Sequence, residues 1–228
     1  MLDNENNAEA GSAQREPQFK VLEAYRPPSD PKLFTRNFYS TMNQRRSIRN
    51  FLSQPIDREI LENAIRTAGT APSGANVQPW YFAVIQSSDL KEKLRREAEE
   101  VETAFYTSTA TAQWQRDLAH LGTGPKKDYL SVAPAIIAVF TRTEVDSERS
   151  YYPLESTGIA VGFLLASLHQ AGLATLTHTP RPMFFLNSVL NLDRTYRPFM
   201  LVITGYPKEP ILVPDISRRP FEAICDFF

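Results

Sequence analysis

Four residues near position 47 have the chemistry of a phosphate-binding site: Arg45, Arg46, Ser47 and Arg49. Guanidinium groups and a hydroxyl at this spacing can grip a phosphate through charge-assisted hydrogen bonds. Taken alone the pattern is weak, because a short run of charges usually lies on a solvated surface. A second basic pair, Arg218 and Arg219, occurs near the C-terminus. Phosphate binding is therefore a hypothesis that needs support from elsewhere in the chain.

A second candidate is the segment Pro72, Ser73 and Gly74, which follows Ala71 and precedes the apolar run Trp80–Ile85. Its backbone amides and its hydroxyl could approach a ligand at the start of a buried strand. Such segments are most often simple turns, so this signal is also weak on its own.

Residue types and spacing alone do not single out Glu102, Tyr106 and Lys127, which stand out only through a resemblance to a known family. Glu102 and Tyr106 are four residues apart and would share one face of a helix. A free amino acid needs an anion for its ammonium group and a cation or hydroxyl for its carboxylate, and this trio supplies both. The alternative is that the acidic run from Glu97 to Glu102 is only a solvated helix face.

Other kinds of chemistry find little support in the sequence. The histidines and the single cysteine lack metal-ligand spacing, so no metal site is predicted: His120, His169, His178 and Cys225. The chain has no G-x-S-x-G turn for a serine nucleophile. Its chemistry must therefore come from polar side chains alone or from a bound organic cofactor.

Composition narrows the class of protein. With 228 residues, 42% of them hydrophobic and 22% charged, the chain can form one substantial globular core. A formal net charge of -1 disfavours nucleic acid or an anionic membrane as the main partner. The longest apolar stretches are too short to span a bilayer, and the polar N-terminus lacks a signal sequence. We therefore expect a cytoplasmic protein.

The elements that must position these residues can be placed coarsely. Residues 1–35 are expected to form an N-terminal arm, disordered to about residue 18 and extended after it. Residues 36–228 are expected to form one domain. Within it, Asp57 would cap a helix with an apolar face, Trp80–Ile85 would be a strand buried on both faces, and Asp89 would begin a charged helix toward Tyr106. The polar stretch from there to Lys127 is a candidate lid.

The second half alternates strands and helices without a strict repeat. Strands are expected at Ala133–Thr141, Ala174–Thr177 and Phe199–Gly205, and a helix at Phe184–Asn191. Glu155–Ala171 would be a helix with apolar residues almost all the way round, buried in a core or in a subunit interface. No glycine-rich nucleotide loop follows a strand, which disfavours a Rossmann domain and favours an α+β fold.

Together, several motifs carry a family resemblance over residues 40–228. RRSIRNF, DREILENAIRTAGTAPSGANVQPW and VPDISRRP resemble the motifs of FMN-binding nitroreductases. RTAGTAPSG, AGLATLTHTP and GYP narrow the resemblance to the halotyrosine dehalogenases, or iodotyrosine deiodinases. The resemblance implies a three-layer α-β-α sandwich around a mostly antiparallel sheet, assembled as an intertwined homodimer with FMN near Pro153–Ser156 of the other subunit.

The resemblance also implies roles for individual residues. Those expected to bind FMN are Arg45, Arg46, Ser47, Arg49, Pro72, Ser73, Gly74, Thr177, His178, Thr179 and Arg218. Thr179 would act catalytically through a hydroxyl at flavin N5, and His178 stands where vertebrate members carry a threonine. Glu102, Tyr106 and Lys127 would bind the zwitterion of the substrate, and the backbone amide of Ala75 its phenolate.

The activity implied is FMN-dependent reductive dehalogenation of 3-halotyrosines. Electrons would come from an unidentified donor, NAD(P)H directly or through a reductase. Two alternatives stay open: a general nitroreductase or quinone reductase on the same fold, and a flavin- or amino-acid-binding protein without turnover.

Overall fold

The structure, a computed structural model, describes residues 18–146 and 148–228. The chain divides into two units, Met1–Phe38 and Tyr39–Phe228. The disorder expected up to about residue 18 falls almost wholly outside the described residues. In the first unit, residues 18–30 carry no helix or strand.

Helix α1 (Pro31–Gln44) begins inside the segment that was expected to be extended. The side chain of Asp30 accepts a hydrogen bond from the backbone N of Lys32 at 3.0 Å, and Pro31 takes the first helical position. Aspartate before the first turn and proline within it are both typical helix starts, and this signal in SDPK was missed.

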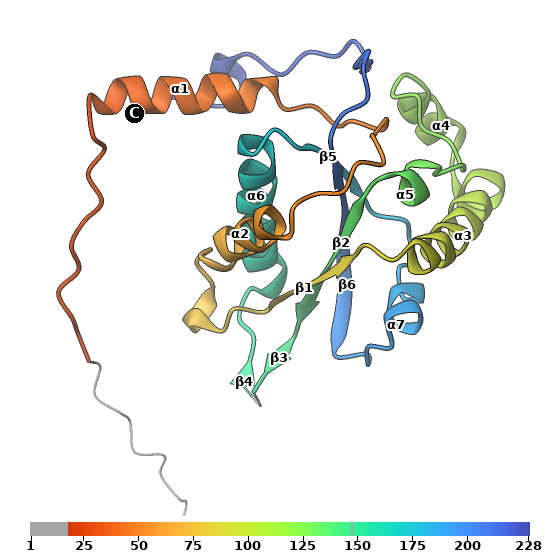
Figure 1. The fold of residues 1–228 in the computed structure, drawn as a ribbon, viewed down its shortest axis with the longest axis horizontal. Coiled ribbons are helices and arrows are strands. Elements are labelled where there is room, and N and C mark those ends of the chain that lie inside the picture. The colour runs from red at the N-terminus through yellow and green to blue at the C-terminus, as the bar shows by residue number, and fades with distance from the viewer. Residues whose placement is uncertain (1–17, 147) are drawn as a thin grey trace, which may run out of the picture. The chain divides into compact units, whose positions relative to one another are not determined.

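The second unit is built on a four-stranded sheet with the strand order β1-β2-β6-β5. Its strands are β1 (Trp80–Ile85), β2 (Ala135–Arg142), β6 (Tyr196–Gly205) and β5 (Ala174–His178). Every pairing is antiparallel. In Figure 1, α2 and α6 cover one face of the sheet, and α3, α5 and α7 cover the other. The predicted three-layer α+β sandwich is confirmed.

The remaining elements fall between these strands in chain order. The longer helices are α2 (Arg58–Gly69), α3 (Ser88–Ala104), α4 (Ala112–Ala119) and α6 (Pro153–Gln170). The short helical segments are η1 (Gly74–Asn76), η2 (Phe105–Thr109, a π-helical turn), α5 (Tyr129–Val132), α7 (Phe185–Leu190) and η3 (Phe221–Ala223). A small hairpin joins β3 (Glu144–Val145) to β4 (Glu148–Arg149).

Strand β2 shows why the core has two halves. Its alternate side chains point to opposite faces of the sheet, as the period of a strand requires. Ile136, Ala138 and Phe140 pack in the cluster that contains residues of α3 and α7. Ala135, Ile137 and Val139 pack in the cluster that contains residues of α2 and α6. A strand buried on both faces is a continuous apolar run in the sequence, and the strand expected at Ala133–Thr141 is confirmed as β2.

Two local predictions were wrong. Strand β1 lies at the edge of the sheet and only Ile85 is buried in it, whereas burial on both faces was expected. Helix α3 begins at Ser88, one residue before the expected Asp89, because the Ser87 side chain accepts a hydrogen bond from the backbone N of Leu90 and so caps the helix. The Asp57 cap of α2 is confirmed by its bond from the backbone N of Glu59 at 2.8 Å.

Helix α6 buries only one of its apolar faces within the chain. Ala160, Val161, Leu164 and Leu168 are buried, while Leu154, Ile159 and Phe163 are 57%, 43% and 39% exposed. Gly158 and Gly162 lie on the same exposed side. The prediction of a helix that is apolar all round is confirmed, and its second face stays open to a partner. Among the described residues, no helix is long and apolar enough to cross a membrane.

Candidate active site

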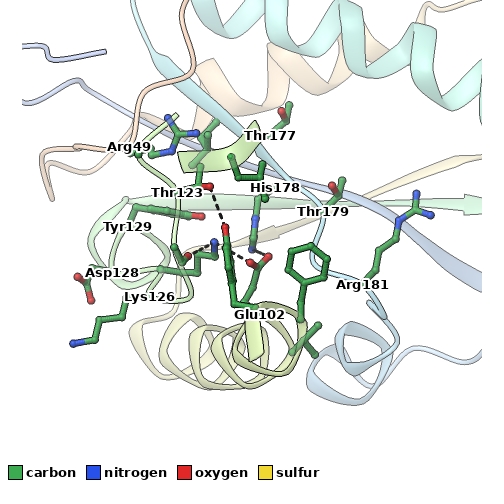
Figure 2. A pocket seen from close by; sticks show the side chains of 18 of the residues that line it. Arg49, Glu102, Thr123, Lys126, Asp128, Tyr129, Thr177, His178, Thr179 and Arg181 are labelled. Carbon is green, nitrogen blue, oxygen red and sulfur yellow. Dashed lines mark hydrogen bonds and ion pairs between the residues drawn. The ribbon is translucent and has the colours of Figure 1, made fainter. Parts of the chain in front are cut away.

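Two adjoining cavities collect most of the predicted site residues. The larger, about 630 Å³, lies between α3, the segment after it and the end of β5, and Figure 2 shows its lining. The smaller, about 240 Å³, lies beside residues 45–49, which pair with β5 through Ser47. Arg49 lines both cavities, so the two are neighbours that share a cation.

The smaller cavity gathers the predicted phosphate-binding residues Arg45, Arg46, Ser47, Arg49 and Arg218. A parallel bridge between Ser47 and Thr175 fixes this segment along the edge of β5. No carboxylate occurs among the described residues that line the cavity. Burial, and then the charges of Arg218 and Arg46, lower the pKa of the Arg45 guanidinium. The cluster is therefore a concentration of positive charge that no anion in the described lining balances.

Arg218 links the C-terminal segment to this cluster. Its Nη1 donates to the backbone O and the Oδ1 of Asn43, both at 3.0 Å, and its Nη2 donates to the backbone O of Arg45 at 2.7 Å. Arg46 donates in turn to the backbone O of Pro214. These bonds hold the two basic segments, far apart in the sequence, around one cavity.

The larger cavity brings Glu102, Tyr106 and Lys127 together. Lys127 Nζ lies 3.1 Å from Glu102 Oε2, and their side chains are only 6% and 14% exposed. Lys127 Nζ also donates to the backbone O of Gly124 at 2.6 Å and lies 6.0 Å from the centre of the Tyr106 ring. The hydroxyls of Tyr106 and Thr123 are 3.0 Å apart. An anion, a cation and a phenol thus meet in one largely buried place.

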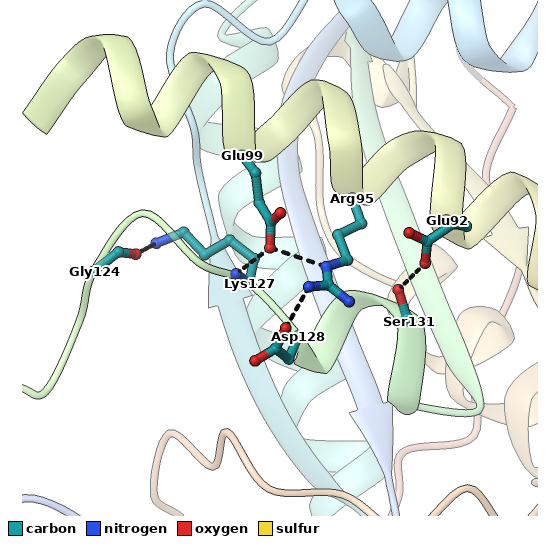
Figure 3. Close-up of polar contacts among 7 residues, drawn as sticks. All are labelled: Glu92, Arg95, Glu99, Gly124, Lys127, Asp128 and Ser131. Atoms are coloured by element: carbon teal, nitrogen blue, oxygen red, sulfur yellow. Dashed lines mark hydrogen bonds and ion pairs between the residues drawn. The ribbon is translucent and has the colours of Figure 1, made fainter.

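A second set of contacts explains why Lys127 reaches that place. Its backbone N donates to Glu99 Oε1 at 2.6 Å, and Arg95 Nε donates to the same atom at 2.9 Å (Figure 3). Arg95 also pairs with Asp128. Burial raises the pKa of Glu99, but the bonds from Lys127 and Arg95 outweigh it, so this pKa lies below its usual value. The acidic run on α3 is therefore more than a solvated face: it anchors the segment that carries Lys127.

His178 has its side chain in the larger cavity, among the residues predicted to bind substrate. Thr177 and Thr179 on either side are exposed and His178 is buried, as alternation along β5 requires. Its Nε2 lies 3.9 Å from Glu102 Oε1 (Figure 2). Burial, and then the charges of Lys127 and Arg49, lower the pKa of His178 to about 3. The imidazole is therefore neutral at ordinary pH.

Tyr129 was not predicted as a site residue. Its ring meets the His178 ring edge to face, with centroids 6.0 Å apart. Burial and the nearby Glu102 carboxylate raise the pKa of its phenol, so the hydroxyl stays protonated. Thr123, Gly124 and Arg181, which line the same cavity, were missed as well. Nothing in their spacing identifies them, because Thr123 and Gly124 come from the segment after α3 and Arg181 from the segment after β5.

The segment Pro72–Ala75 lines neither cavity. It packs elsewhere in the chain: a Cβ on Gly74 would lie 2.7 Å from the backbone O of Tyr151, so only glycine fits there. Ala75, Asn76 and Gln78 have φ values of 50°, 57° and 53°, in the left-handed region. One copy of the chain therefore does not unite this strained loop with the other predicted FMN residues.

In residues 18–146 and 148–228, no three potential metal ligands lie close together.

The model of the nitroreductase family matches residues 42–206 of this chain. The chain belongs to the nitroreductase family. Within this family it groups with iodotyrosine deiodinases. The enzyme of that name from Haliscomenobacter hydrossis is 43% identical over 192 residues, which cover 82% of this chain and 86% of the relative. Iodotyrosine deiodinase 1 of Homo sapiens is 38% identical over 198 residues, covering 83% of this chain and 68% of the relative.

Solved structures agree with this assignment. An iodotyrosine deiodinase bound to FMN and 3-iodo-L-tyrosine superposes with a TM-score of 0.74 at 28% identity, covering 84% of this chain and 100% of the other. A BluB-like flavoprotein from Clostridium difficile 630 gives a TM-score of 0.64 at 24% identity over 83% of this chain and 98% of the other, which shows a shared fold.

Proposed function

We propose that this nitroreductase-family protein is an FMN-dependent reductase that removes iodide, bromide or chloride from 3-halotyrosines. The carrying observation is the buried Glu102–Lys127 pair, 3.1 Å apart, in a cavity that shares Arg49 with a basic pocket. A site for both charges of an amino acid thus adjoins a site for a phosphate. Support comes from the related structure that binds FMN and 3-iodo-L-tyrosine.

The basic pocket fits the phosphate of FMN. A phosphate monoester carries nearly two negative charges, and the described lining offers cations without a balancing carboxylate. Arg45, Arg46, Ser47, Arg49 and Arg218 would hold the phosphate and the ribityl chain. When bound there, FMN supplies the reducing equivalents.

The bound substrate would replace the Glu102–Lys127 ion pair by two new ion pairs. Its ammonium group takes Glu102, and its carboxylate takes Lys127 and the Tyr106 hydroxyl. This exchange leaves no buried charge uncompensated before or after binding, which avoids the main cost of burying ions. The segment from Phe105 to Lys127 carries two of these groups, so binding orders it over the cavity and excludes water.

The reaction must balance two electrons and one proton. The carbon–halogen bond breaks, the halogen leaves as halide with the bonding pair, and a carbon–hydrogen bond forms on the ring. The backbone amide of Ala75 would hold the phenolate oxygen and favour the tautomer that accepts electrons at the halogen-bearing carbon. Thr179, exposed at the end of β5 in the larger cavity, would place its hydroxyl at flavin N5.

A homodimer would complete the site. The loop Pro72–Ala75 lines neither cavity of its own chain and packs against Tyr151, next to Pro153–Ser156. A second copy that covers the open face of α6 could supply these segments to the FMN of its neighbour. Side chains such as Leu154, Ile159 and Phe163 would then be buried, as a stable interface requires.

The electron donor is proposed to be NAD(P)H, acting directly or through a reductase. A cytoplasmic location stays a prediction. A general nitroreductase or quinone reductase is the competing function, because the family fold alone does not choose the chemistry.

Turnover of 3-iodotyrosine by FMN-loaded, dithionite-reduced protein separates these functions, with a nitroaromatic and a quinone as comparison substrates. We expect rapid iodide release that Glu102→Gln abolishes and Glu100→Gln, an exposed neighbour on α3, leaves intact. Fast nitroaromatic or quinone reduction without iodide release would favour the competing function. A flavin-bound protein inactive on all three would be a binding protein.

A further inference from the structure

The imidazole of His178 is buried with an unused ring nitrogen. Its side chain is 9% exposed, and Nε2 has no hydrogen-bond partner among the residues that the structure describes. Buried polar groups are nearly always hydrogen-bonded, so this nitrogen calls for an explanation. The nearest carboxylate oxygen in an ion-pair geometry is Glu102 Oε1 at 3.9 Å, beyond the usual hydrogen-bond range of about 2.7–3.2 Å. The two groups face each other across a short gap.

Glu102 is the partner that can close this gap. His178 is fixed by its strand, where it pairs with Leu201 of β6, and by the Tyr129 ring against its side. Glu102 lies in the last turn of α3, and its other oxygen, Oε2, is held by Lys127 at 3.1 Å. While Lys127 holds it, the carboxylate stays out of reach of the imidazole. A ligand that draws Lys127 away frees the carboxylate to move.

We infer that His178 is a positioning residue for the substrate: in the complex its neutral imidazole donates from Nε2 to Glu102 Oε1 and fixes the carboxylate that receives the ammonium group. This inference rests on the proposed function, because the carboxylate of a halotyrosine is what draws Lys127 away. Two acceptor oxygens then serve two donors, with the substrate ammonium on one and His178 on the other.

The charges around the ring settle which form of His178 acts. Lys127 and Arg49 face it as cations, Glu102 as an anion, and Tyr129 as a neutral phenol. In the free protein burial and the two cations lower its pKa to about 3, and burial, the largest cause, persists when Lys127 moves, so we expect the neutral ring throughout pH 5.5–8. A neutral donor gives no titration of binding in that range, whereas a protonated histidine would tighten binding as the pH falls.

The test compares two amide side chains of different length, glutamine and asparagine, in place of His178. The amide nitrogen of His178→Gln can occupy the place of Nε2, while that of His178→Asn is too short to reach Glu102. We expect His178→Asn to weaken 3-iodotyrosine binding about tenfold, consistent with loss of a hydrogen bond to a charged group, and His178→Gln to stay within about threefold of wild type. His178→Phe, which lacks any donor, should behave like His178→Asn and replaces it if that variant does not fold.

The measurements use FMN-loaded protein and follow the change in flavin fluorescence on adding ligand, at pH 5.5, 6.5 and 8. His120→Phe, an exposed histidine outside both cavities, is the matched control. 3-Iodophenol, which lacks the ammonium and carboxylate groups, should be turned over equally by wild type and every variant. A merely structural role for His178 would impair both substrates alike.

Three results would overturn the inference: an unchanged dissociation constant in His178→Asn and His178→Phe, equal losses in the Asn and Gln variants, or an equal loss with 3-iodophenol. Binding that tightens on acidification in wild type but not in His178→Gln would also contradict a neutral donor. Wild-type protein that neither binds nor dehalogenates 3-iodotyrosine refutes the proposed function itself, which is a separate result.

Discussion

Replacing Lys127 by methionine should destabilise the protein because it leaves the Glu102 carboxylate, which is largely buried, without its cationic partner. Glu102 is 14% exposed and would lose the only ammonium group within ion-pair distance of it among the described residues. Removing one partner of a buried pair costs about 3–5 kcal/mol. Water in the adjoining cavity can still reach the carboxylate, so we expect about 3 kcal/mol, at the lower end of that range.

The double variant Glu102→Gln/Lys127→Met tests whether the loss of stability comes from the unpaired charge. It removes both charges and keeps the volume of both side chains, and replacing a whole buried pair is often close to neutral. We expect its free energy of unfolding to lie within about 1 kcal/mol of wild type. The coupling between the two positions should therefore be about 2 kcal/mol or more, typical of residues in direct contact.

The assay is urea-induced unfolding at one fixed protein concentration with saturating FMN, because both a ligand and a second subunit shift apparent stability. Lys93→Met, an exposed lysine on α3, is the control for loss of a charge. In parallel, 3-iodotyrosine binding should fall in both single variants and in the double variant. Additive losses of stability would show that the pair is not coupled, and normal binding by the double variant would refute its role in holding the zwitterion.

Three further predictions concern the cofactor, the hydroxyl of β5 and the dimer. Arg218→Ala should weaken FMN binding about tenfold or more in a fluorescence titration, because a charge-assisted bond contributes about 1.5–3 kcal/mol, and unchanged affinity would remove Arg218 from the phosphate site. Thr179→Ala should slow iodide release while nitroaromatic reduction stays intact, and equal slowing of both would point to a structural role. Gly162→Leu should shift the protein from dimer to monomer in size-exclusion chromatography, since a Cβ there meets nothing within 4 Å among the described residues of its own chain; a stable dimer would place the interface elsewhere.

The sequence predicts those parts of the fold that depend on residues near one another in the chain. The Asp57 cap, the apolar run of β2 and the apolar surface of α6 each follow from residues close together in the chain. The burial of β1 could not be predicted in this way, because an apolar run does not reveal whether its strand lies at the edge of the sheet. The start of α1 could have been predicted, since Asp30 and Pro31 are an ordinary helix start.

The prediction of the site residues rested more on family resemblance than on residue spacing. The basic residues come from two ends of the chain and meet only through bonds such as Arg218 to Asn43. Lys127 reaches Glu102 because Glu99 holds its backbone, a contact that no local pattern indicates. His178 was predicted to bind flavin, which stays a prediction, and no local pattern indicated that its Nε2 would lie 3.9 Å from Glu102 Oε1.

A single-turnover experiment tests the central claim most directly. Protein loaded with FMN and reduced by two electrons is mixed without oxygen with one equivalent of 3-iodotyrosine, and iodide, tyrosine and flavin absorbance are followed together. The account predicts one iodide and one tyrosine for each flavin reoxidised, with Glu102→Gln blocking all three changes. Flavin that stays reduced in the wild-type protein, with no iodide released, would contradict it.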